Sequence, residues 1–185
     1  MSNTAIIKES LVERVKDFRE ENEFWVALGR TSEWEDERSP PEATGEETEV
    51  EEVFAYIKSE IFLDDEVVVN SAFVKRDEED GWLRWRDRTY RVISEEDIYD
   101  EFATSLMVEV TLADGDFPDV EEFRQAGLYL DLTPEEGYED EMVLAPENVE
   151  ELGQFYGISN FRRVTRVEDR LDTVRMIVHF QEGVY

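Results

Sequence analysis

Short apolar runs separated by Gly, Pro and Asp recur from residue 64 to the C-terminal end, and they limit the possible folds more than any other feature. Runs of this length and composition predict β-strands. The expected strands are 24–28, 67–74, 89–93, 104–112, 128–132, 158–167 and 173–180. In the last of them apolar and polar side chains alternate, which is typical of a strand with one buried face. We therefore expect an α+β fold that is mainly β.

Helical spacing of apolar residues is confined to a few segments. Residues 4–20 and 47–61 each repeat apolar side chains at intervals of three and four, which predicts an N-terminal helix and a second helix. Pro146 begins a third, brief helical pattern. The segment SEED, residues 94–97, fits either a short capped helix or the turn of a hairpin.

The order of these elements suggests two regions in what we expect to be one compact unit. Residues 1–62 hold the N-terminal helix, a strand, a Pro-Pro loop and the second helix. Residues 63–185 form the mainly β region. With 41% apolar residues, the chain has enough material to bury a core.

Charge is the most unusual aspect of the composition. The 49 acidic residues outnumber the 19 basic ones, for a formal charge of −30 at pH 7. Only Lys8, Lys16, Lys58 and Lys75 are lysines, so most bases are arginine, which is less strongly hydrated and pairs with carboxylates through a planar fork. Such a surface suits molar salt, where the screening length falls to roughly 3 Å. We expect a halophilic source; an acidic non-halophile and a mimic of DNA phosphates are the alternatives.

Several classes of function lack the residues that they need. The chain has no Cys, and therefore no disulfide or thiolate metal site. It contains no G-x-S-x-G turn and no glycine-rich phosphate loop, and the acidic clusters lack the spacing of a calcium loop. His179, the single histidine, is expected to face outward from its strand. We expect no catalytic site, no metal and no cofactor.

Partners and location are constrained by the same composition. An acidic surface disfavours binding to nucleic acid or to anionic membranes. The N-terminal segment lacks the pattern of a signal peptide, and no apolar run approaches 18 residues. We expect a soluble protein that is not secreted by a signal peptide.

The segment WLRWRDRTYR, residues 82–91, interleaves aromatic residues with arginines. Base stacking is one use of such a segment. Because DEED and SEED flank it, internal ion pairing and guanidinium–aromatic stacking are a second use. A protein–protein contact is the preferred interpretation, since Trp and Arg anchor interfaces. The candidates are Trp82, Arg84, Trp85 and Arg86.

The segment FWVALGRTSEWEDERSPPE carries a second aromatic residue in polar surroundings. Pro40 and Pro41 keep the backbone extended and prevent it from rejoining a sheet. Trp34 either folds onto its own core or fills a pocket on a neighbouring subunit. Arg30 is placed to pair with Asp36, with Glu35 or with a carboxylate of a partner.

This segment resembles a signature of the baseplate wedge proteins of contractile-tailed bacteriophages, the gene-product-eight family. In that family an aromatic-rich strand leads into Gly-Arg-Thr, a Trp with acids, and Pro-Pro. The matching residues here are Gly29, Arg30, Thr31, Trp34, Asp36, Pro40 and Pro41. FRQAGLYLDL, with Arg124 and Gln125, and TRVEDRLDTVRMIVHF resemble later segments of the family in the same order.

The resemblance implies a two-layer antiparallel β structure with an N-terminal helix and two or three further short helices. It also implies a structural virion protein of the tail or baseplate, assembled in the host cytoplasm and bound to other baseplate proteins and to a second copy of itself. The expected interface residues are Arg30, Trp34, Asp36, Pro40, Pro41, Trp82, Arg84, Trp85, Arg86, Arg124 and Gln125. The acidic composition suggests a tailed virus of a haloarchaeon. Alternatives are an acidic DNA mimic that inhibits a host protein, and a decoration or adaptor protein of a capsid or tail.

Overall fold

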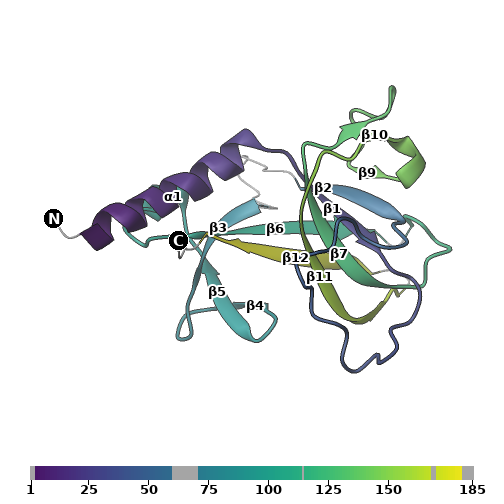
Figure 1. Cartoon of the computed structure of the whole chain (residues 1–185), viewed down its shortest axis with the longest axis horizontal. Coiled ribbons are helices and arrows are strands. Elements are labelled where there is room, and N and C mark those ends of the chain that lie inside the picture. The colour runs from purple at the N-terminus through teal and green to yellow at the C-terminus, as the bar shows by residue number, and fades with distance from the viewer. Residues whose placement is uncertain (1–2, 60–70, 114, 168–169, 181–185) are drawn as a thin grey trace. The chain divides into compact units, whose positions relative to one another are not determined.

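The structure, a computed structural model, describes residues 3–59, 71–113, 115–167 and 170–180. These residues are mainly β, as expected, with antiparallel sheets and a single α-helix (Figure 1). The elements are α1 (Asn3–Glu21), β1 (Phe24–Gly29), β2 (Ala55–Ser59), β3 (Ser71–Arg76), β4 (Leu83–Trp85), β5 (Arg88–Val92), β6 (Ser105–Leu112), β7 (Glu122–Leu130), β8 (Thr133–Pro134), β9 (Val143–Leu144), β10 (Val149–Glu151), β11 (Gln154–Thr165) and β12 (Asp172–His179). Single 3₁₀ turns follow β5 and β9, at Glu95–Asp97 and Pro146–Asn148.

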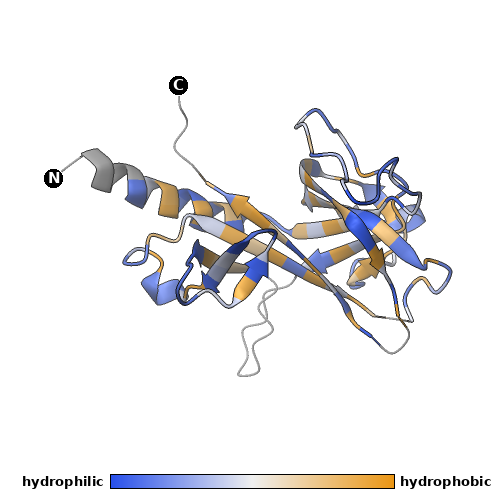
Figure 2. Cartoon of the chain, turned by 90° about the horizontal axis from the view of Figure 1, so that it is seen from below, coloured by the Kyte–Doolittle hydropathy of each residue, from blue (hydrophilic) through white to orange (hydrophobic). Residues whose placement is uncertain are grey.

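Contacts divide the chain into two compact units, each built from separate stretches of sequence. Unit 1 combines residues 1–22, 60–109 and 175–185, and unit 2 combines residues 23–59 and 110–174. The boundary expected near residue 62 lies outside the described residues. Hydrophobic residues, orange in Figure 2, are concentrated on the strands, whereas the loops are mostly hydrophilic.

Unit 1 is a five-stranded sheet, in the order β12-β6-β3-β5-β4, with α1 packed on it. The helix buries Leu11, Val12 and Val15, in agreement with its apolar spacing. Near its end, the guanidinium of Arg19 lies 4.8 Å from the centre of the Phe73 ring of β3. The β4–β5 hairpin projects from the sheet (Figure 1) and pairs Leu83 with Tyr90.

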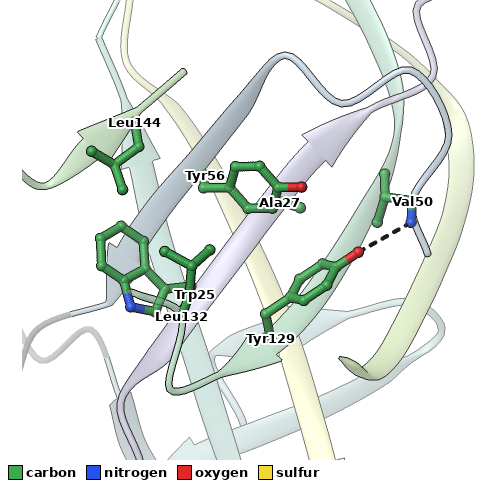
Figure 3. Packing of buried hydrophobic residues seen from close by; sticks show 7 residues of the cluster. All are labelled: Trp25, Ala27, Val50, Tyr56, Tyr129, Leu132 and Leu144. Carbon is green, nitrogen blue, oxygen red and sulfur yellow. Dashed lines mark hydrogen bonds between the residues drawn. The ribbon is translucent and has the colours of Figure 1, made fainter. Parts of the chain in front are cut away.

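Unit 2 contains a second five-stranded sheet, in the order β11-β7-β1-β2-β9, and the short β8–β10 pair. Every residue of β1 is buried, so both faces of the strand are covered, and β7 and β2 pair with its two edges. This explains why its sequence is a continuous apolar run. Figure 3 shows the core beside it, where the Tyr129 hydroxyl accepts a hydrogen bond from the Val50 N–H at 3.4 Å.

The second helix expected at 47–61 is wrong. Residues 50–54 form a loop and residues 55–59 form β2, while residues 60 and 61 lie outside the described part of the chain. The apolar run 53–57 is rich in aromatic and β-branched residues, which also suit a strand. β1 has a free side that β2 fills, so tertiary pairing prevails over the helical spacing.

Smaller differences affect the other expected helices. Residues 94–97 adopt the short helix rather than the hairpin turn, with the Ser94 hydroxyl donating to Asp97 at 2.6 Å. The helix after Pro146 is limited to one 3₁₀ turn, because β10 and β11 follow it. Gly153 turns the chain between these strands with a φ of 68°, where a Cβ would lie 2.1 Å from the Leu130 carbonyl oxygen. In the described residues, the further short helices are therefore only these two 3₁₀ turns.

Candidate functional site

The loop between β1 and β2, residues 30–54, packs back onto the sheet of unit 2 at two glycines. A Cβ on Gly127 of β7 would lie 2.3 Å from Cγ2 of Val50. A Cβ on Gly29 would lie 2.4 Å from the Glu51 carbonyl oxygen and 2.7 Å from Cγ1 of Val50. Separations this short exclude any side chain, so both glycines are needed for close approach of the loop.

Backbone hydrogen bonds secure the same crossing. The Arg30 N–H donates to the Glu51 carbonyl at 2.6 Å, and the Phe54 N–H donates to the Leu28 carbonyl at 3.0 Å. Arg30 and Glu52 both have a positive φ, of 50° and 48°. Non-glycine residues rarely adopt this conformation, so the tertiary contacts hold the two ends of the loop in place.

Arg124 of β7 connects the loop to the sheet from within. Its side chain is fully buried, yet it donates hydrogen bonds to Glu37 at 2.5 Å, to Glu122 at 2.6 Å and to the Thr31 carbonyl at 2.8 Å. Desolvation opposes ionisation of Glu37, but the hydrogen bonds from Arg124 and from the Trp34 N–H outweigh it and lower the pKa of Glu37. A buried guanidinium with several acceptors specifies one geometry for the loop.

Gln125, the next residue of β7, contacts two different segments. Its side-chain oxygen accepts from the Glu51 N–H at 2.9 Å, and its amide nitrogen donates to Asn160 of β11 at 2.9 Å. Asn160 in turn donates to the Pro41 carbonyl at 3.0 Å. The stretch Arg124-Gln125 therefore holds both the start and the end of the loop.

Trp34 lies against its own chain, with only 8% of its surface exposed. Its indole N–H donates to the Phe161 carbonyl of β11 at 2.9 Å, and the Arg30 guanidinium lies 3.8 Å from the ring centre. Arg30 forms an ion pair with Glu51, rather than with Asp36 or Glu35, the two carboxylates of its own chain that were expected. The Asp36 carboxylate instead accepts from the Arg38 N–H at 2.9 Å.

Seven of the expected interface residues thus gather in unit 2, although they lie almost 100 positions apart in the sequence. The contacts of Arg30, Trp34, Arg124 and Gln125 described above position the loop. The exposed members are Asp36 and Pro41, and Pro40 is half-buried. The seven residues are Arg30, Trp34, Asp36, Pro40, Pro41, Arg124 and Gln125.

The other four expected residues lie on the β4–β5 hairpin of unit 1. Trp85 is half-buried: its indole N–H donates to the Arg175 carbonyl at 3.0 Å, and the Arg86 guanidinium lies 4.5 Å from its ring. Trp82, in contrast, is 72% exposed. Arg84 and Arg86 are exposed as well. The hairpin therefore presents one large aromatic ring and several guanidinium groups to the outside.

Two comparisons with known proteins cover most of the chain. The model of a family described as baseplate wedge 3 tail fiber network component matches residues 4–180. The chain belongs to this family. It is also 25% identical over 159 residues to virion protein 3 of Enterococcus phage phiEF24C, covering 85% of this chain and 84% of that protein.

This membership in the baseplate wedge 3 family confirms the expectation of a phage baseplate protein. The family is a structural component of the virion. In the described residues, no group of three or more His, Asp or Glu side chains is arranged to hold a metal ion. Nor does the described part of the chain contain a helix long and apolar enough to cross a membrane.

Sequence reasoning missed a basic pocket in unit 1, because its residues are scattered from α1 to the end of β12. His179 lies in it and is hydrogen-bonded at both ring nitrogens, although its side chain is exposed as expected. The scarcity of lysine was the one signal in the sequence. The structure shows that two of the four lysines, Lys8 and Lys75, line this pocket.

Proposed function

We propose that this protein is a structural part of a phage tail baseplate, acts through protein–protein contacts and performs no reaction. The family match over residues 4–180 carries the proposal, and the virion protein of an Enterococcus phage supports it. On this view the chain is assembled into the virion in the host cytoplasm. It binds other baseplate proteins and a second copy of itself.

The outer face of the β4–β5 hairpin is the contact surface that we propose for unit 1. It combines Trp82, Arg84 and Arg86, which are all exposed. Trp and Arg are the residue types that most often dominate the binding energy of interfaces. The half-buried Trp85 and the buried Tyr90 keep the hairpin in position, since their rings pack at 6.5 Å.

For unit 2 we propose that the outer side of the 30–54 loop contacts a neighbour. The buried residues Trp34, Arg124 and Gln125 then act as positioning residues, because they fix the loop from below. Asp36 and Pro41 are exposed. A loop that is already ordered loses little conformational entropy when it binds.

Incorporation of variants into particles tests the hairpin surface. Trp82→Ser should leave folding almost unchanged, because exposed substitutions usually alter stability by less than about 0.5 kcal/mol. The same change should lower the copy number of the protein in purified particles at least several-fold. Quantitative mass spectrometry of particles from infected cells, complemented with each variant, measures this number.

Leu171→Ser provides the matched control, because Leu171 is 63% exposed and lies in unit 2. It should be incorporated like the natural protein. Normal incorporation of Trp82→Ser would remove the hairpin from the proposed interface. Absence of the natural protein from particles would contradict the structural role itself.

The acidic exterior is the remaining part of the proposal. We attribute the charge of −30 to a halophilic host, in whose cytoplasm salt screens the repulsion between carboxylates. Long-range electrostatic steering is weak in such a solvent, so apolar contact and short-range pairing would supply most of the affinity.

A further inference from the structure

The pocket in unit 1 is basic, which is unexpected in so acidic a chain. It lies between α1, β3, β5 and the end of β12 and has a volume of about 490 Å³. Four cationic side chains line it: Lys8, Lys75, Arg76 and Arg88. None of the described lining residues is Asp or Glu, although acids make up 49 of the 185 residues. Composition alone does not explain this segregation.

Nearby carboxylates compensate these cations only in part. Lys75 binds Glu101 at 3.1 Å; the same carboxylate also pairs with Arg91, which binds Asp77 at 2.7 Å as well. The partner of Arg76 is Glu78, whose side chain is 75% exposed. Ion pairs that are this exposed are weak, and solvent competes for them. Solvent and a bound anion can therefore still reach the cations of the pocket.

Carboxylates of the chain compensate the charges of Lys8 and Arg88 even less. The Lys8 ammonium lies 5.1 Å from the centre of the Phe102 ring. Arg88 approaches the highly exposed Asp87 only at 4.0 Å. Both cations therefore remain available to an anion that enters the pocket.

Polar side chains line the pocket together with these cations. His179 Nε2 lies 3.2 Å from the Tyr90 hydroxyl, and His179 Nδ1 lies 2.8 Å from the Ser105 hydroxyl. Desolvation of the ring lowers the pKa of His179, and the charges of Arg88 and Arg86 lower it further. Only the smaller part of this shift, from Arg88 and Arg86, reports on the nearby cations.

Apolar side chains complete the pocket and distinguish it from a simple ion site. Leu11, Val74, Phe102 and Phe180 contribute to its lining. Phe102 is 37% exposed and has a φ of 50°, a conformation that is costly for a bulky residue. A ligand that carries both a carboxylate and an apolar group would satisfy both parts of this lining.

We propose that this basic pocket binds an acidic segment of a neighbouring baseplate protein, with a carboxylate against the cations and an adjacent apolar side chain against Phe102. The inference rests on the proposed structural function, which supplies a protein as the partner. A short peptide segment fits better than a nucleic acid, because a long polyanion would be repelled by a chain whose net charge is −30. The volume is in the range of known ligand pockets.

Because His179 is the only histidine, its imidazole signals in an NMR spectrum report on this pocket alone. We would titrate the whole chain with the blocked tetrapeptide Asp-Leu-Glu-Phe under salt conditions in which it is folded. Binding should shift the His179 signals and raise their titration midpoint, since a bound carboxylate favours the cationic ring. The neutral peptide Asn-Leu-Gln-Phe should bind at least tenfold more weakly. Equal binding of the two peptides, or no shift with either, would overturn the proposal.

Variants identify the cations responsible. Lys8→Gln and Arg88→Gln should each weaken binding of the acidic peptide at least fivefold. Lys16→Gln is the matched control on α1, since Lys16 pairs with Glu20 away from the pocket, and it should change binding less than twofold. An equal loss with Lys16→Gln would reduce the effect to net charge and refute a specific pocket.

Titrations with inorganic phosphate and with a short oligothymidylate test whether the pocket prefers a different kind of anion. Both should bind more weakly than the acidic peptide. Tighter binding of either one would assign the pocket to phosphate chemistry and overturn the proposal. These measurements use purified protein, so their failure is separate from failure of the particle-incorporation experiment that tests the structural role.

Discussion

The contact between Val50 and Gly127 allows the packing of the 30–54 loop to be tested with a double-mutant cycle. Gly127→Ala places a Cβ 2.3 Å from Val50 Cγ2 and 3.2 Å from Phe155 Cε2. Overpacking of this kind costs about 1–3 kcal/mol. Val50→Ala removes two buried methyl groups and should cost about 2 kcal/mol through lost burial and the remaining cavity.

The two substitutions together should cost less than the sum of the single effects. Without the Val50 methyl groups, the new Cβ fills space that would otherwise be a cavity. Replacing Gly by Ala also lowers the entropy of the unfolded chain, which is worth about 0.4–1 kcal/mol. We expect a favourable coupling of at least ~1.5 kcal/mol. Hydrogen exchange of the β1 and β7 amides measures the stability of unit 2 separately from unit 1.

Gly29→Ala serves as the matched control. Its Cβ would lie 2.4 Å from the Glu51 carbonyl oxygen, which is a backbone atom, so Val50→Ala cannot relieve this clash. The destabilisation should persist in that double variant. If Gly127→Ala and Val50→Ala were additive to within about 0.5 kcal/mol, the loop would not pack on β7 as described.

Three further predictions concern the aromatic residues and the charge. Trp34→Ala should destabilise unit 2 by about 3–5 kcal/mol, and Trp34→Phe by only about 1 kcal/mol through loss of the bond to Phe161, as measured by the same hydrogen exchange. Burial raises the pKa of Tyr56 to about 12, with smaller effects of Tyr129 and Glu49. The contribution of the neutral Tyr56 phenol to the free energy of unfolding is complete below pH 10 and is lost as pH rises toward 12, by up to about 1.4 kcal/mol per pH unit. In unfolding measurements over a series of alkaline pH values, Tyr56→Phe should make this decline less steep. Because the charge of −30 repels itself, the melting temperature should rise when KCl increases from about 0.1 M to about 2 M, and a flat dependence would remove the argument for a halophilic source.

Local patterns were sufficient for some elements and ambiguous for others. α1 and β1 were predictable, because one repeats apolar residues at helical spacing and the other is a short, wholly apolar run. Residues 47–61 fit a helix equally well by spacing, yet 55–59 are a strand. Residues 55–59 form a strand because they pair with the open edge of β1, and no short stretch of the sequence reveals that edge.

The sequence by itself determined that the chain is mainly β, strongly acidic and similar to baseplate wedge proteins, because composition, short-range periodicity and motif order are local properties. The tertiary structure decided what the motif residues do. Trp34 reaches a carbonyl 127 positions away, at Phe161, and Arg124 reaches back to Glu37. The tertiary structure also brings Lys8, Lys75, Arg88 and His179 into one pocket. Such contacts arise from strand pairing across the whole chain, which the spacing of residues along the sequence does not encode.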